Sequence, residues 1–114
     1  MQPDIRVWLF DVLEAIANVE EYMAGIPAGF KSYKENKMLK QAVDRKLEII
    51  GEAVNRVRKS GQGVEVTNAK QIIDLRNRII HSYDAIQDDI IYSIVIRQLP
   101  LLKAELRVLL NIVP

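Results

Sequence analysis

The sequence predicts an all-α fold, an up-and-down antiparallel bundle of four main helices that forms a single domain over residues 1–114. Apolar residues recur every three or four positions through four long segments, which is the spacing of one face of an α-helix. Short breaks rich in glycine, serine or proline separate these segments, and short connections favour antiparallel neighbours. No segment alternates apolar and polar residues for long enough to form a strand. A length of 114 residues and an apolar content of 49% fit one core.

The first helix is predicted over residues 4–24. Pro3 lies just before it, and proline suits the start of a helix because the N–H that it lacks has no partner there. Gly25, Pro27 and Gly29 then break the chain. The apolar stripe that should face the core comprises Ile5, Leu9, Val12, Ile16, Val19 and Met23.

The second helix is predicted over residues 35–59. Gly51 in its middle costs about 1 kcal/mol relative to alanine, so we expect another helix to approach closely at this point. Residues 60–63, Ser-Gly-Gln-Gly, form the next break. The apolar stripe of this helix comprises Leu39, Val43, Leu47, Ile50, Val54 and Val57.

The third helix is predicted to begin near Thr67 or Asn68, either of which can cap it, and to reach Tyr83. Its core-facing residues are expected to be Ile72, Leu75 and Ile79.

The fourth helix is predicted to begin at Asp88 or Asp89, because carboxylates are favourable at a helix N-terminus, and to end near Leu110. Pro100 lies inside this segment and lacks a backbone donor. We therefore expect the last helix to be kinked, or split in two, near Leu99.

Composition and charge limit the possible function classes. The absence of cysteine excludes disulfides, thiolate zinc sites and cysteine nucleophiles. A single histidine, with acids that lack ligand spacing, gives no support for a metal site, and no cofactor is expected. The first residues carry no signal-peptide pattern, and no apolar run approaches the roughly 18 residues of a membrane span, so we expect a soluble cytoplasmic protein.

The net charge of +1 is unevenly distributed. Residues 1–30 hold one arginine and five acids, a net of −4, whereas residues 31–59 hold nine lysines or arginines and four acids, a net of +5. A basic middle segment could contact phosphates, but it could equally be a solvated helix face. Charge alone does not decide between these interpretations.

The segment that carries chemistry is residues 76–84, Arg-Asn-Arg-Ile-Ile-His-Ser-Tyr-Asp, which includes the chain's single histidine. At about 100° per residue, with Arg76 at zero, Asn77 lies near 100°, His81 near 140° and Tyr83 near −20°. The four residues therefore share an arc of about 160° on one side of the helix. His81 is the candidate general acid or base, since its unperturbed pKa is about 6.5.

An arginine can hold a phosphate through two parallel hydrogen bonds and stabilise the charge that develops on it. Arg76 and His81 are thus the candidate catalytic residues, with Asn77 orienting one of them, for RNA cleavage in which the ribose 2′-OH attacks the adjacent phosphorus. Alternatively, Arg76 and His81 pair with carboxylates such as Asp74 or Asp84 in a purely structural network. The spacing leaves both interpretations open.

A homodimer is predicted from the apolar residues beside this arc. Ile73 and Ile80 lie near 60° and 40°, inside the polar arc, where they would be unfavourable in water. Packing of this face on a second copy would cover them. It would also bring two His81 imidazoles to one groove, which provides the acid and the base that a single chain lacks.

The pattern Arg76-x4-His81-x-Tyr83 resembles the R-x4-H-x-Y signature of the HEPN superfamily, and the HepT-like ribonuclease toxins in particular. Residues 46–53, Lys-Leu-Glu-Ile-Ile-Gly-Glu-Ala, resemble the second helix of that group, and residues 90–102 resemble its final helix. The Arg76-Asn77 pair is similar as well. Gln87 departs from the pattern, since an acidic residue is common there, and this should affect helix capping more than chemistry.

The resemblance implies helical dimers with a composite cleft and a metal-independent endoribonuclease activity on tRNA or mRNA. It also implies a partner, an MNT-type minimal nucleotidyltransferase antitoxin, that can transfer AMP to the motif tyrosine, here Tyr83. Phosphates added beside Arg76 and His81 would fill the site and repel RNA.

Two further interpretations stay open. The chain could be a non-catalytic accessory subunit that presents a nucleotide or substrate to a nucleotidyltransferase, with the Arg-His-Tyr cleft binding phosphate only. It could also be a structural helical dimer in which the motif is a buried polar network. Arg78 lies near 200° on the wheel, outside the arc, and is not assigned to the catalytic core.

Overall fold

The computed structural model describes residues 2–67, 69–81 and 88–111. For residues 69, 70, 76 and 79–81 the description covers the backbone alone. The described chain is helical throughout, with short connections. In chain order its elements are α1 (Pro3–Ala24), α2 (Phe30–Lys34), α3 (Lys37–Lys59), α4 (Ala69–His81), α5 (Asp88–Ser93), the π-helical segment η1 (Ile94–Gln98) and α6 (Leu99–Leu109).

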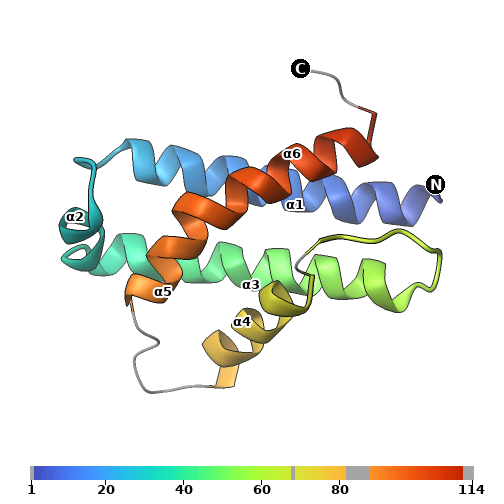
Figure 1. Ribbon diagram of the computed structural model, residues 1–114. Helices are drawn as coiled ribbons and strands as arrows, with labels where there is room; N and C mark the ends of the chain where they lie inside the picture. The colour runs from blue at the N-terminus through green and yellow to red at the C-terminus, as the bar shows by residue number, and fades with distance from the viewer. Residues whose placement is uncertain (1, 68, 82–87, 112–114) are drawn as a thin grey trace.

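The long helices run alternately in opposite directions (Figure 1). α1 and α3 lie antiparallel and pack along their length, α4 packs on the other side of α3, and the α5–η1–α6 arm returns across α3 and α1. This arrangement confirms the predicted all-α, up-and-down antiparallel bundle. Over the described residues, no helix combines the length and the apolar character needed to cross a membrane.

The core is formed by the stripes that the periodicity predicts. Leu9 and Val12 of α1 and Val43 and Ile50 of α3 have no exposed surface. Each residue predicted for the second stripe is buried, and so are all those of the first stripe except Met23, which is half-buried. Side chains from the C-terminal arm complete this core: Ile91, Val95, Leu99, Leu102, Leu106 and Leu110.

The second predicted helix is wrong at its start. A separate short helix, α2, precedes α3, and Asn36 lies between them in an extended conformation. The Asn36 side chain accepts a hydrogen bond of 2.9 Å from the Leu39 N–H, which is the geometry of an N-cap. Because the cap satisfies one of the first donors of α3, it fixes the start of α3 at Lys37.

The predicted break in the last helix takes the form of a change in helical register. η1 comes directly before α6, whose second residue is Pro100. Pro100 cannot donate to the carbonyl four residues earlier, and its ring crowds that carbonyl. A wider π-helical turn accommodates this, as shown by the Leu99 N–H, which bonds to the carbonyl of Ile94 five residues back.

The segment that leads into α4 is tied to α6. After α3, Gly61 and Gly63 adopt positive φ angles of 67° and 75°, which only glycine adopts readily. The Thr67 N–H then donates to the Glu105 carboxylate at 2.9 Å, and the Thr67 hydroxyl donates to the same group. Thr67 is thus engaged by Glu105, while Asn68, the other predicted cap, lies outside the described residues.

One face of α4 is buried against the bundle, as expected for Ile72 and Leu75. The expectation for Ile73 is wrong, because this side chain is only 7% exposed within one protomer and needs no second copy to cover it. Gly51 of α3 is also buried, in line with the close helix approach predicted there.

Candidate functional site

The predicted catalytic segment lies on α4. The backbone is α-helical from Ala69 to His81, so the register assumed for Arg76, Asn77 and His81 is the register of the structure. Asn77 is exposed and engaged in an interaction of its own. The side chains of Arg76 and His81, and all of Tyr83, lie outside the described residues.

The described side chains divide α4 into two faces. Ile72, Ile73 and Leu75 are buried, whereas the polar side chains Gln71, Asp74, Asn77 and Arg78 are exposed. On the helical wheel these four polar residues fall between about 100° and 220° from Arg76, and position 81, near 140°, falls within the same arc. In this register, His81 is one turn beyond Asn77 and Arg78.

A groove of about 520 Å³ separates this polar face from the C-terminal arm. Leu75 of α4 is buried at its base, and the half-buried Ile90 of α5 and Ile94 of η1 give it an apolar floor. Its polar lining consists of Gln71, Asp74, Arg78, Asp89, Ser93 and Gln98. We call this surface the α4–α5 groove.

Within the part of the chain that the structure describes, the polar groups of the α4–α5 groove form no hydrogen bonds or ion pairs with one another. Among the described residues, the hydrogen bonds and ion pairs leave Asp74, Arg78 and Asp89 without a partner. The sequence-based interpretation considered Asp74 only as an ion-pair partner, did not assign Asp89 to the site, and left Arg78 outside the catalytic core. The i, i+3, i+4, i+7 spacing of Gln71, Asp74, Leu75 and Arg78 places them on one helix face, which is the signal that could have revealed them.

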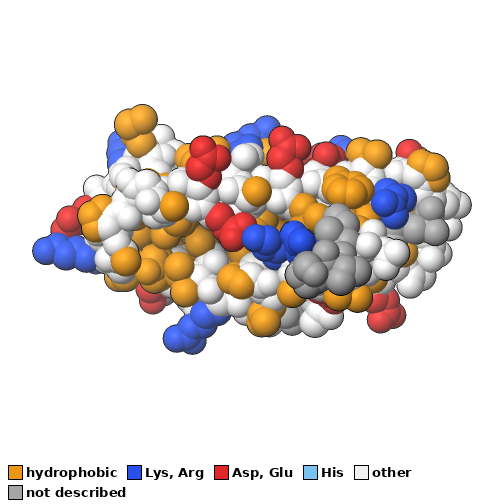
Figure 2. Space-filling model, turned by 90° about the horizontal axis from the view of Figure 1, so that it is seen from above, with side chains coloured by type: hydrophobic (Ala, Val, Ile, Leu, Met, Phe, Trp, Pro, Cys, Tyr) orange, Lys and Arg blue, Asp and Glu red, His pale blue; other side chains and the backbone are white. Residues whose placement is uncertain are grey.

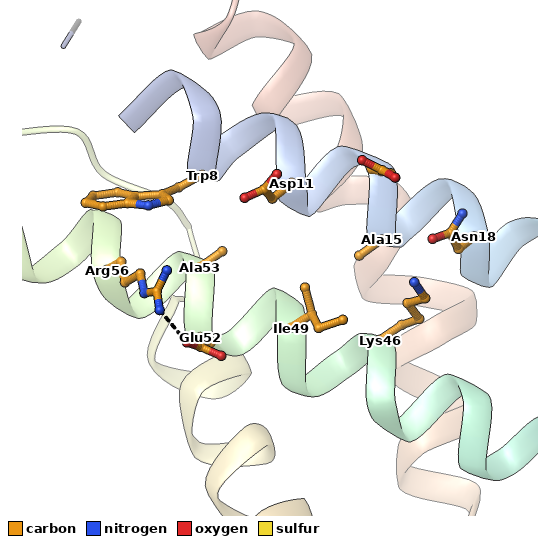
Figure 3. Close-up of a pocket in the computed structure, with 10 residues that line it drawn as sticks. Trp8, Asp11, Ala15, Asn18, Lys46, Ile49, Glu52, Ala53 and Arg56 are labelled. Carbon is orange, nitrogen blue, oxygen red and sulfur yellow. Dashed lines mark hydrogen bonds and ion pairs between the residues drawn. The ribbon is translucent and has the colours of Figure 1, made fainter. Parts of the chain in front are cut away.

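A second groove, of about 270 Å³, lies between α1 and α3 (Figure 3). Trp8 and Asp11 line it from α1, and Lys46, Glu52 and Arg56 line it from α3. Two of these charged groups form an ion pair, since the Arg56 guanidinium lies 2.6 Å from the Glu52 carboxylate. The groove includes part of the 46–53 segment that resembles the HepT-like second helix. We call this surface the α1–α3 groove.

The third concave surface is apolar. It lies between the C-terminal half of α1 and the η1–α6 junction and has a volume of about 350 Å³. The broadest group of hydrophobic side chains on the face seen in Figure 2 lies at its left part, and charged and hydrophobic side chains are interspersed along the rest. The Lys103–Glu20 ion pair, at 3.1 Å, joins α6 to α1 beside this surface. Ile96, which is 48% exposed, is the most exposed of its large hydrophobic side chains.

A polar cluster lies where α2, α3 and α5 meet. Lys40 and Asp88 form an ion pair of 3.2 Å that ties the first residue of α5 to α3. Burial, followed by the charges of Asp88 and Glu48, raises the pKa of Asp44 to about 6, although Lys40 lowers it. Burial and the nearby carboxylates also raise the pKa of the Tyr33 hydroxyl, which has no hydrogen-bond partner among the described residues.

The comparisons with known proteins confirm the family resemblance. The sequence model of the ribonuclease HepT-like family matches residues 12–109. A protein of Methanocaldococcus jannaschii that is provisionally named an RNase is 33% identical over 107 residues, which cover 92% of this chain and 95% of the relative. A second protein of that organism with the same kind of name is 32% identical over 98 residues, 85% of this chain and 79% of the relative.

A more distant relative comes from Caldanaerobacter subterraneus subsp. tengcongensis and is also provisionally named an RNase. It is 28% identical over 107 residues, which cover 93% of this chain and 94% of the relative. No solved structure is significantly similar to the chain. The family match runs from within α1 to the last residue of α6 and includes the whole of α4, so this chain belongs to the HepT-like ribonuclease family of the HEPN superfamily.

Proposed function

We propose that the protein is a metal-independent RNA endonuclease that acts as the toxin of a HEPN/MNT toxin–antitoxin pair. The observation that carries the proposal is the unbroken α-helical backbone of α4 from Ala69 to His81, which holds Arg76 and His81 in a fixed register. Membership of the HepT-like ribonuclease family supports the reaction class. The exposed Asn77 and Arg78 support access of RNA to this side of the helix.

In this proposal Arg76 binds the scissile phosphate and stabilises the charge that develops on it. His81 takes a proton from the ribose 2′-OH or gives one to the leaving 5′-oxygen. The 2′-oxygen attacks phosphorus, the P–O5′ bond breaks, and a cyclic phosphate and a free 5′-OH result. Asn77 positions one of these groups. None of these steps requires a metal ion.

We propose that the active site is composite and lies at the interface of a homodimer. A chain with one histidine offers one imidazole, whereas this reaction needs an acid and a base. Burial of Ile73 removes one reason for the dimer, and the need for a second imidazole remains.

The proposed partner is an MNT-type nucleotidyltransferase antitoxin that transfers AMP from ATP to the Tyr83 oxygen and releases pyrophosphate. Tyr83 is two residues beyond His81, so the added phosphate would lie close to the proposed site. A phosphate there would compete with RNA for Arg76 and repel the RNA backbone.

The test is RNA cleavage by the purified protein in EDTA. His81→Ala and Arg76→Ala are each expected to lower the cleavage rate by at least about 100-fold, the usual contribution of general acid–base catalysis or of a phosphate-stabilising donor. Arg58→Ala, which removes an exposed arginine from α3, is the matched control and should cleave normally. Circular dichroism should show the same helical content for every variant.

Equal activity of the wild type and His81→Ala, or no cleavage of tRNA and mRNA pools by either, would refute the nuclease proposal and favour the accessory-subunit interpretation. A monomeric mass in light scattering would refute the composite site. Incubation with the nucleotidyltransferase and ATP should add one AMP to the wild type and none to Tyr83→Phe. An equal gain of mass in both proteins would exclude Tyr83 as the acceptor.

A further inference from the structure

The α4–α5 groove has the construction of a small-molecule subsite. Its floor is apolar, from Leu75, Ile90 and Ile94, and its walls carry polar groups that no other described group engages. A concave apolar surface with a few convergent polar groups is typical of a site for a flat organic ligand. The π-helical register of η1 supplies Ile94 and Gln98 to one wall, and π-helical turns are frequent at functional sites.

The charged groups of the groove favour the edge of a nucleobase over a phosphate. Asp74 projects from α4 and Asp89 from α5, so a carboxylate stands on each wall. A carboxylate only accepts hydrogen bonds, which suits the amino group of adenine, cytosine or guanine. Uracil carries no amino group, and its O4, which takes the place of the cytosine amino group, would be repelled by a carboxylate. Gln71 and Gln98 can donate to the ring nitrogens or carbonyls of such a base.

The groove also lies close to the proposed catalytic residues along α4. Arg78 lines it and is one turn after Asp74 on α4. Position 81 is one further turn along the same helix, about 10 Å beyond Asp74 at 1.5 Å per residue. Arg78 can therefore hold a backbone phosphate between a base in the groove and a ribose near His81.

We propose that the α4–α5 groove binds one RNA base that carries an exocyclic amino group, and that it thereby discriminates against uracil close to the cleavage site. The proposal rests on the proposed ribonuclease function, because it takes RNA as the ligand. It adds a specificity-determining subsite made of Asp74, Asp89 and Arg78, outside the Arg76–His81 pair.

The experiment measures binding, so that cleavage does not interfere. Fluorescein-labelled octauridine, and the same oligomer with one central adenine, cytosine or guanine, are titrated with His81→Ala protein in EDTA and followed by fluorescence anisotropy. A single amino-bearing base should tighten binding about tenfold, as expected for a good base-edge contact. Asp74→Asn/Asp89→Asn in the same background should bring that ratio close to one.

The matched control is Asp11→Asn/Glu14→Gln in the α1–α3 groove, which removes two carboxylates as well. It should keep the tenfold ratio even if the lower negative charge strengthens binding of every RNA. Equal affinity for all four oligomers, a ratio that survives Asp74→Asn/Asp89→Asn, or binding of none of them would overturn the inference. If RNA cleavage depends on His81 but the oligomers bind without base preference, only the subsite proposal is refuted. If the oligomers bind with base preference but the wild type does not cleave RNA, only the nuclease proposal is refuted.

Discussion

The two polar grooves of the protein differ in how their charges are used. In the α1–α3 groove, the guanidinium of Arg56 is bound to Glu52 at 2.6 Å, as the dashed line in Figure 3 shows. In the α4–α5 groove, the described residues give Asp74, Arg78 and Asp89 no such partner. Among the described residues, one ion pair uses two of the five charged groups that line the first groove, whereas none of the three charged groups that line the second groove is paired.

The helices that form the two grooves differ in length and in how much of the buried core they contribute. α1 and α3 have 22 and 23 residues and contribute most of the side chains with no exposed surface. α4 has 13 residues, and the opposite wall of its groove is the short α5 and the π-helical η1. This comparison indicates that α1 and α3 provide the stable scaffold, while the polar groups of the α4–α5 groove lie on the shorter elements that it supports.

The largest effect on folding is expected in the scaffold, from Leu9→Ala. Leu9 has no exposed surface, so the substitution leaves a cavity between α1 and its neighbours. Loss of a buried leucine side chain typically lowers the free energy of unfolding by about 2 to 5 kcal/mol. Urea denaturation followed by circular dichroism measures the change. Uracil discrimination by the folded protein should stay as in the wild type.

Val7→Ala is the matched control, because Val7 is on the same helix and 56% exposed. Its effect on the free energy of unfolding should be within about 0.5 kcal/mol. If Leu9→Ala lowered the free energy of unfolding by less than about 1 kcal/mol, α1 would not be part of the stable scaffold, and the proposed difference between the two pairs of elements would be wrong.

The scaffold was largely predictable from the sequence because helical periodicity is a local property. The stripes from Ile5 to Val19 and from Leu39 to Val57 are spaced by three or four residues, and the structure buries each of their members. The effect of Pro100 was predicted for the same reason, since a missing donor acts within one turn. The exact form of that effect, a π-helical turn over Ile94–Gln98, depends on packing around it.

The candidate site was less predictable because it depends on which elements meet. Arg76 and His81 are recognisable from their spacing and family resemblance, whereas Asp89 and Gln98 join Asp74 only through the tertiary arrangement. The prediction for Ile73 was wrong for the same reason: its position on the helical wheel suggested that it is exposed, but α4 packs so that Ile73 is buried. A helical wheel gives the direction of a side chain but not the element that it meets.

The second-largest effect on stability is expected at the junction between α3 and α5, from Asp44. Burial and the charges of Asp88 and Glu48 raise the pKa of Asp44 from 3.8 to about 6, despite the opposing charge of Lys40. The folded state therefore binds this proton more tightly than the unfolded state does. The resulting penalty is absent below about pH 4, grows between pH 4 and 6, and is complete above pH 6.

Asp44→Asn should remove this penalty and increase the free energy of unfolding at pH 7. A rise in pKa of that size corresponds to about 3 kcal/mol, and partial exposure of Asp44 reduces the expected gain to about 1 to 2 kcal/mol. Urea denaturation of both proteins at pH 4, 5, 6 and 7 measures it, and the two curves should meet near pH 4. Asp11→Asn, at an exposed position of α1, is the control. A destabilised Asp44→Asn at pH 7 would mean that the ionised carboxylate has a stabilising partner.

The smallest effect is expected in the α1–α3 groove, from Glu52→Gln. The Glu52 and Arg56 side chains are 48% and 56% exposed, and such an i, i+4 pair contributes about 0.3 to 0.5 kcal/mol. A double-mutant cycle with Arg56→Ala, measured by urea denaturation, should give a coupling in that range. The affinity ratio between adenine-containing and uracil-only oligomers should not change, because both residues lie outside the α4–α5 groove. If Glu52→Gln abolished that ratio, the two grooves would not be separate in function, and RNA recognition would extend across α3.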